Sequence, residues 1–313
     1  MGKTRKKRNH PKGWLVGSNA TQIICGSFVL VIALGTLLLT LPIASRSGRL
    51  GVVDAMFTAT SATCVTGLVV RDTWTQFTMF GQVVILLLIQ VGGLGFMTIA
   101  CLFFFALRRR IGLRQRMVLA QALGSDTYSG IVSLVRNILR GTAAVEGVGA
   151  LILFFRFLPE FGFGRALWYG VFHSISAYCN AGFDVLGDLA SGGSLCGYVD
   201  DPVVNLTIMA LITIGGLCFA VWGDIRKNRR FSRLSVYSRL VVAISLGLTL
   251  GGAAVIALLE WNNPGTIGGL PAGGRVLASL FQSVTLRTAG FASFDQNALR
   301  DVTKAVCDVL MFV

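Results

Sequence analysis

The stretch SATCVTGLVV, Ser61 to Val70, decides the fold because it breaks a long apolar sequence. The apolar segment that leads into it, residues 52–59, is too short for a helix that crosses a bilayer, which needs about 20 residues. Gly67 then supplies a residue that can adopt backbone angles forbidden to other residues. The stretch therefore predicts a short helix that stops inside the apolar region, followed by a tight loop.

The composition is that of a membrane protein. Of the 313 residues, 54% are hydrophobic and only 13% are charged, whereas soluble domains have about 25% charged residues. The net charge of +14 lies in clusters beside apolar runs, while a nucleic-acid-binding protein carries its basic residues on a soluble surface. We therefore expect no nucleic-acid partner. The seven cysteines show no CxxC pair or metal-ligand spacing and are expected to be buried thiols.

Long apolar segments predict five full membrane spans, because each reaches the length that a transmembrane helix needs. They lie at about 21–41, 80–107, 132–157, 203–222 and 240–259. Shorter pieces between the spans are helical in pattern, and each ends five to seven residues before a glycine. These pieces lie at 51–60, 165–177 and 274–285. We expect them to be re-entrant, dipping into the membrane and returning on the same side.

The distribution of charge tests this topology. Seventeen Lys and Arg residues lie in the segments 1–20, 108–116 and 224–239, where Asp224 is the only acid. The segments expected on the other side hold nine basic and ten acidic residues. Basic residues concentrate on the cytoplasmic side of membrane proteins. We therefore predict a cytoplasmic amino terminus and short helices that enter from outside.

Three copies of one pattern follow each other along the chain. Alignment on Gly67, Gly182 and Gly290 matches ATCVTGL, AYCNAGF and TLRTAGF, and these glycines are 115 and 108 residues apart. The spans after the first two loops also match, as VGGLGFMTIA from Val91 and IGGLCFAVW from Ile214. The repeated unit is therefore span, short helix, glycine loop, span.

The repeat predicts an all-α integral membrane protein in which units of span, pore helix, filter loop and span surround a single pore. The expected organisation is a basic cytoplasmic tail followed by three repeats, the third cut off inside its second span. These parts are residues 1–20, 21–116, 117–239 and 240–313. Closure of a ring implies a fourth repeat, which is absent from this chain.

The short helices and loops have a chemistry suited to cations. A helix that enters from outside directs the partial negative charge of its carboxyl end at the membrane interior. Carbonyl oxygens of the loop can replace the hydration shell of an ion there, and small residues such as Thr66, Ala181 and Ala289 would let several loops approach one axis. The alternative is that each glycine is an ordinary turn residue, which three copies in register argue against. Acids that fit a cation-attracting vestibule are Asp54, Asp72, Asp184 and Asp188.

The motif VGGLGF, which begins at Val91, resembles a dinucleotide-binding fingerprint only superficially. It lies inside a predicted span and no strand precedes it. We expect its glycines, Gly92, Gly93 and Gly95, to form a close helix-packing interface.

Two polar residues inside apolar sequence also receive structural interpretations. His173 has serines nearby but no orienting group or oxyanion site for nucleophilic catalysis, so no enzyme activity is expected. An ionised carboxylate within a span is costly. Glu146 is therefore expected to pair with Arg140 or a backbone donor, with a role in the ion path as the alternative.

These motifs resemble the membrane subunit of the Ktr/Trk potassium uptake family of bacteria. The match is carried by DAMFTATSATCVTGLVVRDT, GQVVILLLIQVGGLGFMT, FHSISAYCNAGFD, DIRKNRRFS, NNPGT and SVTLRTAGF, and it extends from about Gln22 to the last residue. A single span before the first loop points to the Ktr branch. Leu286 stands where many relatives have proline. The resemblance implies that backbone carbonyls form a K+ selectivity filter, three quarters of which are Val65, Thr66, Gly67, Asn180, Ala181, Gly182, Thr288, Ala289 and Gly290.

The resemblance also implies the function and the partners. The expected function is potassium uptake across the bacterial cytoplasmic membrane through a K+-selective, channel-like, multi-pass subunit, with K+ as the transported ion. A sodium or unselective monovalent cation transporter of the same family is the alternative. Two chains are expected to form a homodimer in the lipid membrane. A cytosolic regulatory ring, which alone binds a nucleotide, is expected to gate them by meeting the basic stretches RRRIGLRQR and DIRKNRRFSR.

Overall fold

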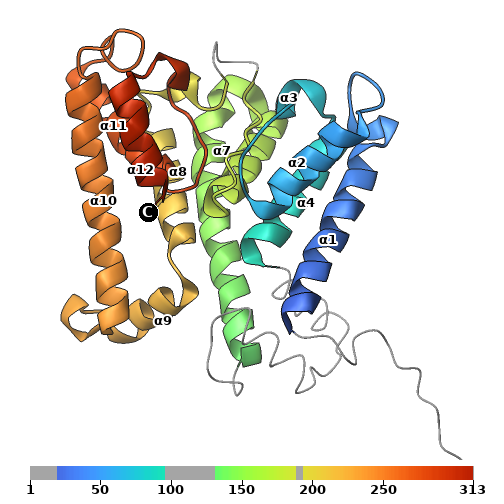
Figure 1. The fold of residues 1–313 in the computed structure, drawn as a ribbon, viewed down its shortest axis with the longest axis horizontal. Helices are drawn as coiled ribbons and strands as arrows, with labels where there is room; N and C mark the ends of the chain where they lie inside the picture. The colour runs from blue at the N-terminus through green and yellow to red at the C-terminus, as the bar shows by residue number, and fades with distance from the viewer. Residues whose placement is uncertain (1–19, 96–130, 188–192, 313) are drawn as a thin grey trace, which may run out of the picture.

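The protein is almost entirely helical in the part that the structure describes. The computed structural model describes residues 20–95, 131–187 and 193–312. Its α-helices are α1 (Ala20–Leu39), α2 (Val52–Cys64), α3 (Thr73–Gln76), α4 (Met79–Leu94), α7 (Ile131–Tyr178), α8 (Pro202–Gly216), α9 (Phe219–Asn228), α10 (Val236–Glu260), α11 (Ala272–Thr285) and α12 (Asp301–Phe312). Over these ranges no β-strand occurs, and one isolated antiparallel bridge joins Ser45 and Phe77. The predicted all-α fold is confirmed (Figure 1).

The first group of helices consists of a long helix, a short helix and a second long helix. In Figure 1, α1 crosses the bundle, α2 turns back into it, and α4 runs in the direction opposite to α1. Backbone hydrogen bonds join the end of α1 to the start of α4, from Thr78 N to Ala44 O at 3.0 Å and from Arg46 N to Gln76 O at 2.8 Å. The chain between them therefore enters and leaves at one end of the bundle, as predicted for the first short piece.

α7 contains both the third predicted span and the second short piece, joined at a kink. Gly162 has a φ of 71°, a left-handed value that favours glycine and turns the chain between the two arms. The rings of Phe157, Phe161 and Tyr169 pack edge to face across the kink, with centroids 5.0 to 6.5 Å apart. The second arm ends at Tyr178, shortly before the second glycine loop.

α10, α11 and α12 repeat the arrangement. Glu260, at the end of α10, is buried, and its carboxylate accepts from the backbone N of Arg300 at 3.0 Å and from the Thr303 hydroxyl at 2.5 Å. These bonds hold the end of α10 against the start of α12. α11 therefore also enters and leaves at one end of the bundle, the end at which α2 begins (Figure 1).

Two helices in the described ranges are long and apolar enough to cross a membrane, Val135–Tyr178 and Val236–Glu260. α8 and α9 would make a third if they formed one span, but the chain bends by 98° between them. The predicted continuous span 203–222 is therefore wrong. α1 and α4 contribute shorter apolar helices. The second half of the predicted span 80–107 and the basic segment 108–116 lie outside the described residues.

A close packing contact explains the break after α8. A side chain on Gly215 would overlap the carbonyl of Tyr178 at the end of the second short helix, and the backbone is extended at Leu217. The helix thus stops where it touches the short helix. The Trp222 indole N–H donates to Ile214 O at 2.9 Å, which satisfies a carbonyl at the helix end that has lost its helical partner.

The equivalent glycines of α4 pack in the same way. A side chain on Gly92 would overlap the carbonyl of Thr63, and one on Gly93 would lie 2.5 Å from the sulfur of Cys179. The predicted helix-packing interface is confirmed for both glycines. It is wrong for Gly95, where an added side-chain carbon would meet no described residue within 4 Å; this glycine instead follows the end of α4 with a φ of 77°.

The cysteines differ in burial. Cys179 and Cys307 are buried and Cys196 is intermediate, whereas Cys25, Cys64 and Cys218 are exposed. The prediction of buried thiols is therefore wrong for the last three. Among the described residues, no group of three His, Cys, Asp or Glu side chains is placed to hold a metal ion.

Candidate functional site

Loops with the same backbone follow the three short helices. The first residue of each loop, Val65, Asn180 or Thr288, has a φ of 57°, 56° or 64°. The glycine two residues later has a φ of 72°, 68° or 80°. A positive φ is uncommon for residues other than glycine, so its recurrence at the first position shows that the three loops share one conformation.

The glycines of the three loops approach one another closely. A side-chain carbon on Gly67 would lie 2.8 Å from the carbonyl oxygen of Ala181, and one on Gly182 would lie 2.6 Å from that of Ala289. A carbon on Gly290 would lie 3.3 Å from the Cα of Gly182 and 3.9 Å from that of Gly67. Loops that are far apart in the sequence thus meet backbone to backbone, where glycine allows the closest approach.

Each loop is tied to its own short helix by a side-chain hydroxyl, which donates to the carbonyl of the residue after the glycine. The pairs are Ser61 with Leu68, Ser176 with Phe183 and Thr285 with Phe291, each 2.7 Å apart. Sequence reasoning missed these residues. The sequence does contain a signal for them. A residue with a hydroxyl group lies six positions before the glycine in the first two copies, but five positions before it in the third, and this shift by one residue conceals the repeat.

The carbonyl groups of the nine predicted filter residues remain available. Over the described part of the chain, no hydrogen bond is accepted by a backbone oxygen of residues 65–67, 180–182 or 288–290. Backbone carbonyls without a partner in the protein can replace the water around an ion. A cation is favoured here, because the carboxyl ends of three short helices carry partial negative charge. The structure thus brings all nine residues together in three adjacent loops.

Carboxylates beside the loops have different partners. Asp54 pairs with Arg71 at 3.0 Å, and Asp72 caps α3. Asp184 is partly buried, and its Oδ1 has no partner among the described residues. Burial, together with the nearby charge of Asp72, raises the pKa of Asp184 to about 6. Asp188 lies outside the described residues, so the complete vestibule stays a prediction.

Glu146 has a partner that the sequence did not indicate. Its carboxylate accepts from Gln90 Nε2 at 3.1 and 3.3 Å, and its backbone carbonyl accepts from Ser174 Oγ at 2.7 Å. The predicted pairing with Arg140 is therefore wrong. Gln90 belongs to α4, so Glu146 connects the first group of helices to the second short helix.

His173 is a packing residue between the second and third loops. It is fully buried, and its Nδ1 lies 2.8 Å from the carbonyl oxygen of Tyr169. Its ring centroid is 6.1 to 6.4 Å from those of Phe157, Phe172 and Phe291. These buried, aromatic surroundings fit a core histidine.

Apolar helices with short re-entrant helices, whose carboxyl ends meet at backbone loops, define an all-helical membrane protein. The sequence model of the family described as "TrkH: Cation transport protein" matches residues 3–313. The chain belongs to this family, and the resemblance carried by the loop motifs is confirmed.

The chain is also similar to individual members. It is 44% identical over 292 residues to Ktr system potassium uptake protein B of Bacillus subtilis (strain 168). The aligned region covers 93% of this chain and 64% of that protein. The protein of the same name in Vibrio alginolyticus is 38% identical over 309 residues, 98% of this chain and 66% of the relative. The potassium/sodium uptake protein NtpJ of Enterococcus hirae is 37% identical over 293 residues, 93% of this chain and 64% of the relative. The chain thus spans 64 to 66% of the length of these relatives.

A solved structure shares the fold. The crystal structure of the potassium transporter TrkH from Vibrio parahaemolyticus superposes with a TM-score of 0.67 at 15% sequence identity. The match covers 95% of this chain and 57% of that one. It supports the arrangement of helices described above.

Proposed function

We propose that this protein takes up potassium as the channel-like subunit of a transporter in the bacterial cytoplasmic membrane, with K+ as the transported ion. One observation carries the proposal: three loops with the same backbone conformation meet at their glycines, at the ends of short helices, and their carbonyl oxygens accept no hydrogen bond from any residue that the structure describes. Such oxygens can replace the water around a dehydrated ion. The proposed ligands are the carbonyls of residues 65–67, 180–182 and 288–290.

The names of the relatives support a cation substrate and a transporter rather than an enzyme. Two relatives are named as potassium uptake proteins, and one as a potassium/sodium uptake protein. A sodium or unselective monovalent cation transporter is therefore the second candidate. The experiment below distinguishes the two.

We further propose a cytoplasmic amino terminus, a homodimer, and gating by a cytosolic ring that alone binds a nucleotide. The described part of the proposed docking surface is α9 with the turn after it, which lies at the end of the bundle where α1 begins (Figure 1). Asp224 fixes this turn by accepting from Ser235 N at 2.8 Å and from Asn228 Nδ2 at 2.6 Å. The exposed basic residues here are Arg226, Lys227, Arg229, Arg230 and Arg233.

Replacement of Gly67 by serine in the complete protein tests the filter. The new side chain would meet the Ala181 carbonyl and displace oxygens that stand in for water around K+. A smaller, more strongly hydrated ion gains less from a fixed cage of oxygens and loses less when the cage deforms. We therefore expect the ratio of K+ to Na+ uptake to fall about tenfold, equivalent to about 1.4 kcal/mol.

Uptake of both ions is measured in a host that lacks potassium transport, with expression quantified. Gly147→Ser is the matched control, because Gly147 lies in α7 and has no atom within 4 Å of an added side-chain carbon. A Gly67→Ser protein with normal expression and the wild-type ratio would show that the loop is not the filter. A wild type that takes up both ions equally would favour the unselective transporter.

A further inference from the structure

A short segment between the second and third loops contacts the third loop directly. This segment, residues 193–201, is here called the linking strap. Leu195 N donates to Ala292 O at 2.9 Å, and Ala292 N donates to Ser194 Oγ at 3.1 Å. Leu195 is only 1% exposed and belongs to the hydrophobic core, which anchors the strap at this point. Ala292 lies two residues after Gly290, and the strap therefore holds the third loop just beyond the proposed filter.

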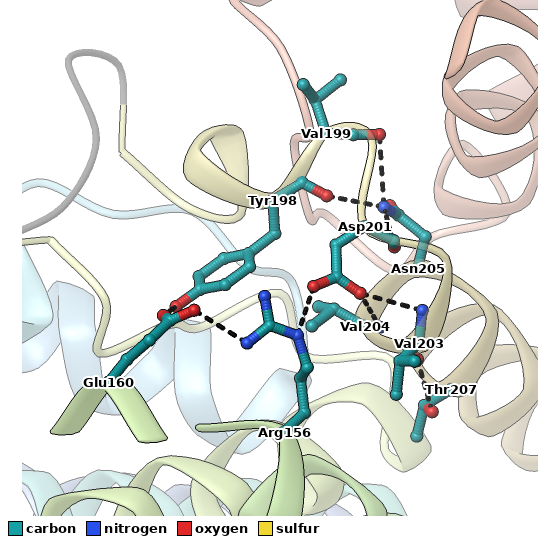
Figure 2. Close-up of polar contacts among 9 residues, drawn as sticks. All are labelled: Arg156, Glu160, Tyr198, Val199, Asp201, Val203, Val204, Asn205 and Thr207. Carbon is teal, nitrogen blue, oxygen red and sulfur yellow. Dashed lines mark hydrogen bonds and ion pairs between the residues drawn. The ribbon is translucent and has the colours of Figure 1, made fainter. Parts of the chain in front are cut away.

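The other end of the strap is fixed by an ionic network between α7 and α8 (Figure 2). Arg156 lies between two carboxylates: its Nε is 2.5 Å from Asp201 Oδ2, and its Nη1 is 2.7 Å from Glu160 Oε1. The Tyr198 hydroxyl donates to the other oxygen of Glu160, and the guanidinium lies 5.5 Å from the centre of the Tyr198 ring. Arg156 and Glu160 of α7 thus hold Asp201 and Tyr198 of the strap.

Further hydrogen bonds make this end of the strap rigid. Asp201 caps α8 by accepting from two backbone N–H groups of its first turn at 2.9 and 3.1 Å, and the Asn205 amide donates to Tyr198 O at 2.7 Å. Without Arg156, the carboxylates of Glu160 and Asp201 would remain close together with no opposite charge between them. Like charges in this position repel, so the strap would lose its ionic attachment to α7 and keep there the hydrogen bond from Tyr198 to Glu160.

We propose that Arg156 is a positioning residue for the third filter loop and acts through the linking strap on Ala292. The proposal rests on the proposed filter role of residues 288–290. The path is continuous, because Arg156 holds Asp201, the strap runs back from Asp201 to Ser194, and Ser194 holds Ala292. Carbonyls that replace the water around an ion must keep their positions. A loosened strap should therefore change the discrimination between K+ and Na+ more than it changes the amount of protein.

Two changes at opposite ends of the strap test the path in the complete protein. Arg156→Gln removes the charge, and Ser194→Ala removes one hydroxyl that binds Ala292. For each we expect the ratio of K+ to Na+ uptake to fall roughly fivefold, equivalent to about 1 kcal/mol. Asp201→Asn should act like Arg156→Gln, because asparagine keeps the helix cap and loses only the charge. Arg156→Lys should restore part of the ratio, since it keeps the charge.

Thr207→Ala is the control, because it removes an exposed hydroxyl that bonds only within α8, to Val203 O at 2.7 Å, and does not involve the strap. The double variant Arg156→Gln/Ser194→Ala should be no less selective than the worse single variant, because both act on one path. Fully additive losses would overturn the proposal, as would wild-type ratios in the single variants at normal expression. Ser194→Ala keeps the test decisive if Arg156→Gln fails to fold. A wild type that does not discriminate K+ from Na+ would instead refute the proposed function.

Discussion

The first and second glycine loops have the same backbone in different surroundings. In the second loop Ala181, Gly182 and Phe183 are buried, whereas in the first loop Thr66 is exposed and Leu68 is 60% exposed. The φ values nevertheless agree, at 57° and 56° for the first residue and 72° and 68° for the glycine. The conformation therefore does not depend on burial. Both loops share local bonds to their own short helix: the hydroxyl tie, and a backbone bond from Thr66 N to Ser61 O or from Ala181 N to Ser176 O.

The third loop is intermediate. Ala289 and Phe291 are buried, while Thr288 and Gly290 are exposed. The first and third loops line a common cavity of about 580 Å³. The second loop has another loop on each side, and only its first residue, Asn180, lines the neighbouring cavity of about 380 Å³. Hydrogen bonds to its own short helix thus accompany the conformation of each loop, and the adjacent loops determine how tightly it is packed. We expect the loss of uptake and of stability on substitution to be largest in the most tightly packed loop.

The largest effects are expected from alanine at the three glycines, in the order Gly182, Gly67, Gly290. All three have positive φ, for which a side chain costs roughly 1–2 kcal/mol. At Gly182 an added carbon also meets two backbone atoms, at 2.6 and 2.9 Å; at Gly67 it meets one, at 2.8 Å; and at Gly290 the nearest is at 3.3 Å. K+ uptake per expressed protein and Tm in detergent should both fall in this order.

Gly147→Ala is the control for replacing a glycine by alanine where no neighbour is disturbed, because an added carbon there meets no described residue within 4 Å. It should keep the uptake and Tm of the wild type. Equal losses at the three loop glycines would show that backbone strain alone matters, and the comparison of packing would be wrong.

A smaller effect is expected when the hydroxyl ties are removed. Ser176→Ala leaves the carbonyl of Phe183 buried without a donor, which should lower the free energy of unfolding by about 1–3 kcal/mol. Ser61→Ala should cost less, because water can reach the carbonyl of the exposed Leu68. Urea unfolding measures both, with Thr60→Ala as the control, since Thr60 is on the same helix and bonds only within it. A larger loss at Ser61 than at Ser176 would contradict the role assigned to burial.

The loops were predictable from the sequence because their form is encoded locally. A short apolar helix, small residues and a glycine recur within about a dozen residues, so Gly67, Gly182 and Gly290 align without knowledge of the fold. The long spans were predicted from the length of their apolar runs, which is also a local property. The span predicted at 240–259 is part of α10, which begins after the capping residue Ser235.

The features that were missed depend on contacts between distant residues. Hydropathy continues through residues 203–222, and the break after α8 arises where Gly215 meets the second short helix. Gln90 binds a carboxylate 56 residues away, and Arg156 one 45 residues away. No periodicity in the sequence marks such pairs, because their partners are chosen by the packing of whole helices.

The smallest effect is expected at Asp184, which distinguishes the second loop from the others: two residues after the glycine, the first loop has Val69 and the third has Ala292. Its raised pKa, about 6 against a usual 3.8, means that the folded protein holds the proton more tightly than the unfolded chain does. The ionised carboxylate therefore destabilises the fold above about pH 6, and this destabilisation disappears as the pH falls toward 4. Asp184→Asn should raise Tm at pH 7.5 and leave it unchanged near pH 4. The gain should be smaller than the loss at Ser176, because the carboxylate is only partly buried.

Thermal unfolding in detergent at the two pH values checks this, with Asp54→Asn as the control. Asp54 already has an opposite charge at 3.0 Å in Arg71, so its replacement should not raise Tm at either pH. An equal gain for Asp184→Asn at pH 4 and pH 7.5 would show that the effect comes from shape or hydrogen bonding rather than from charge. A gain confined to pH 7.5 would instead show that the tightly packed second loop accepts an ionised acid only at a cost to stability, a cost that its neighbours avoid with apolar residues.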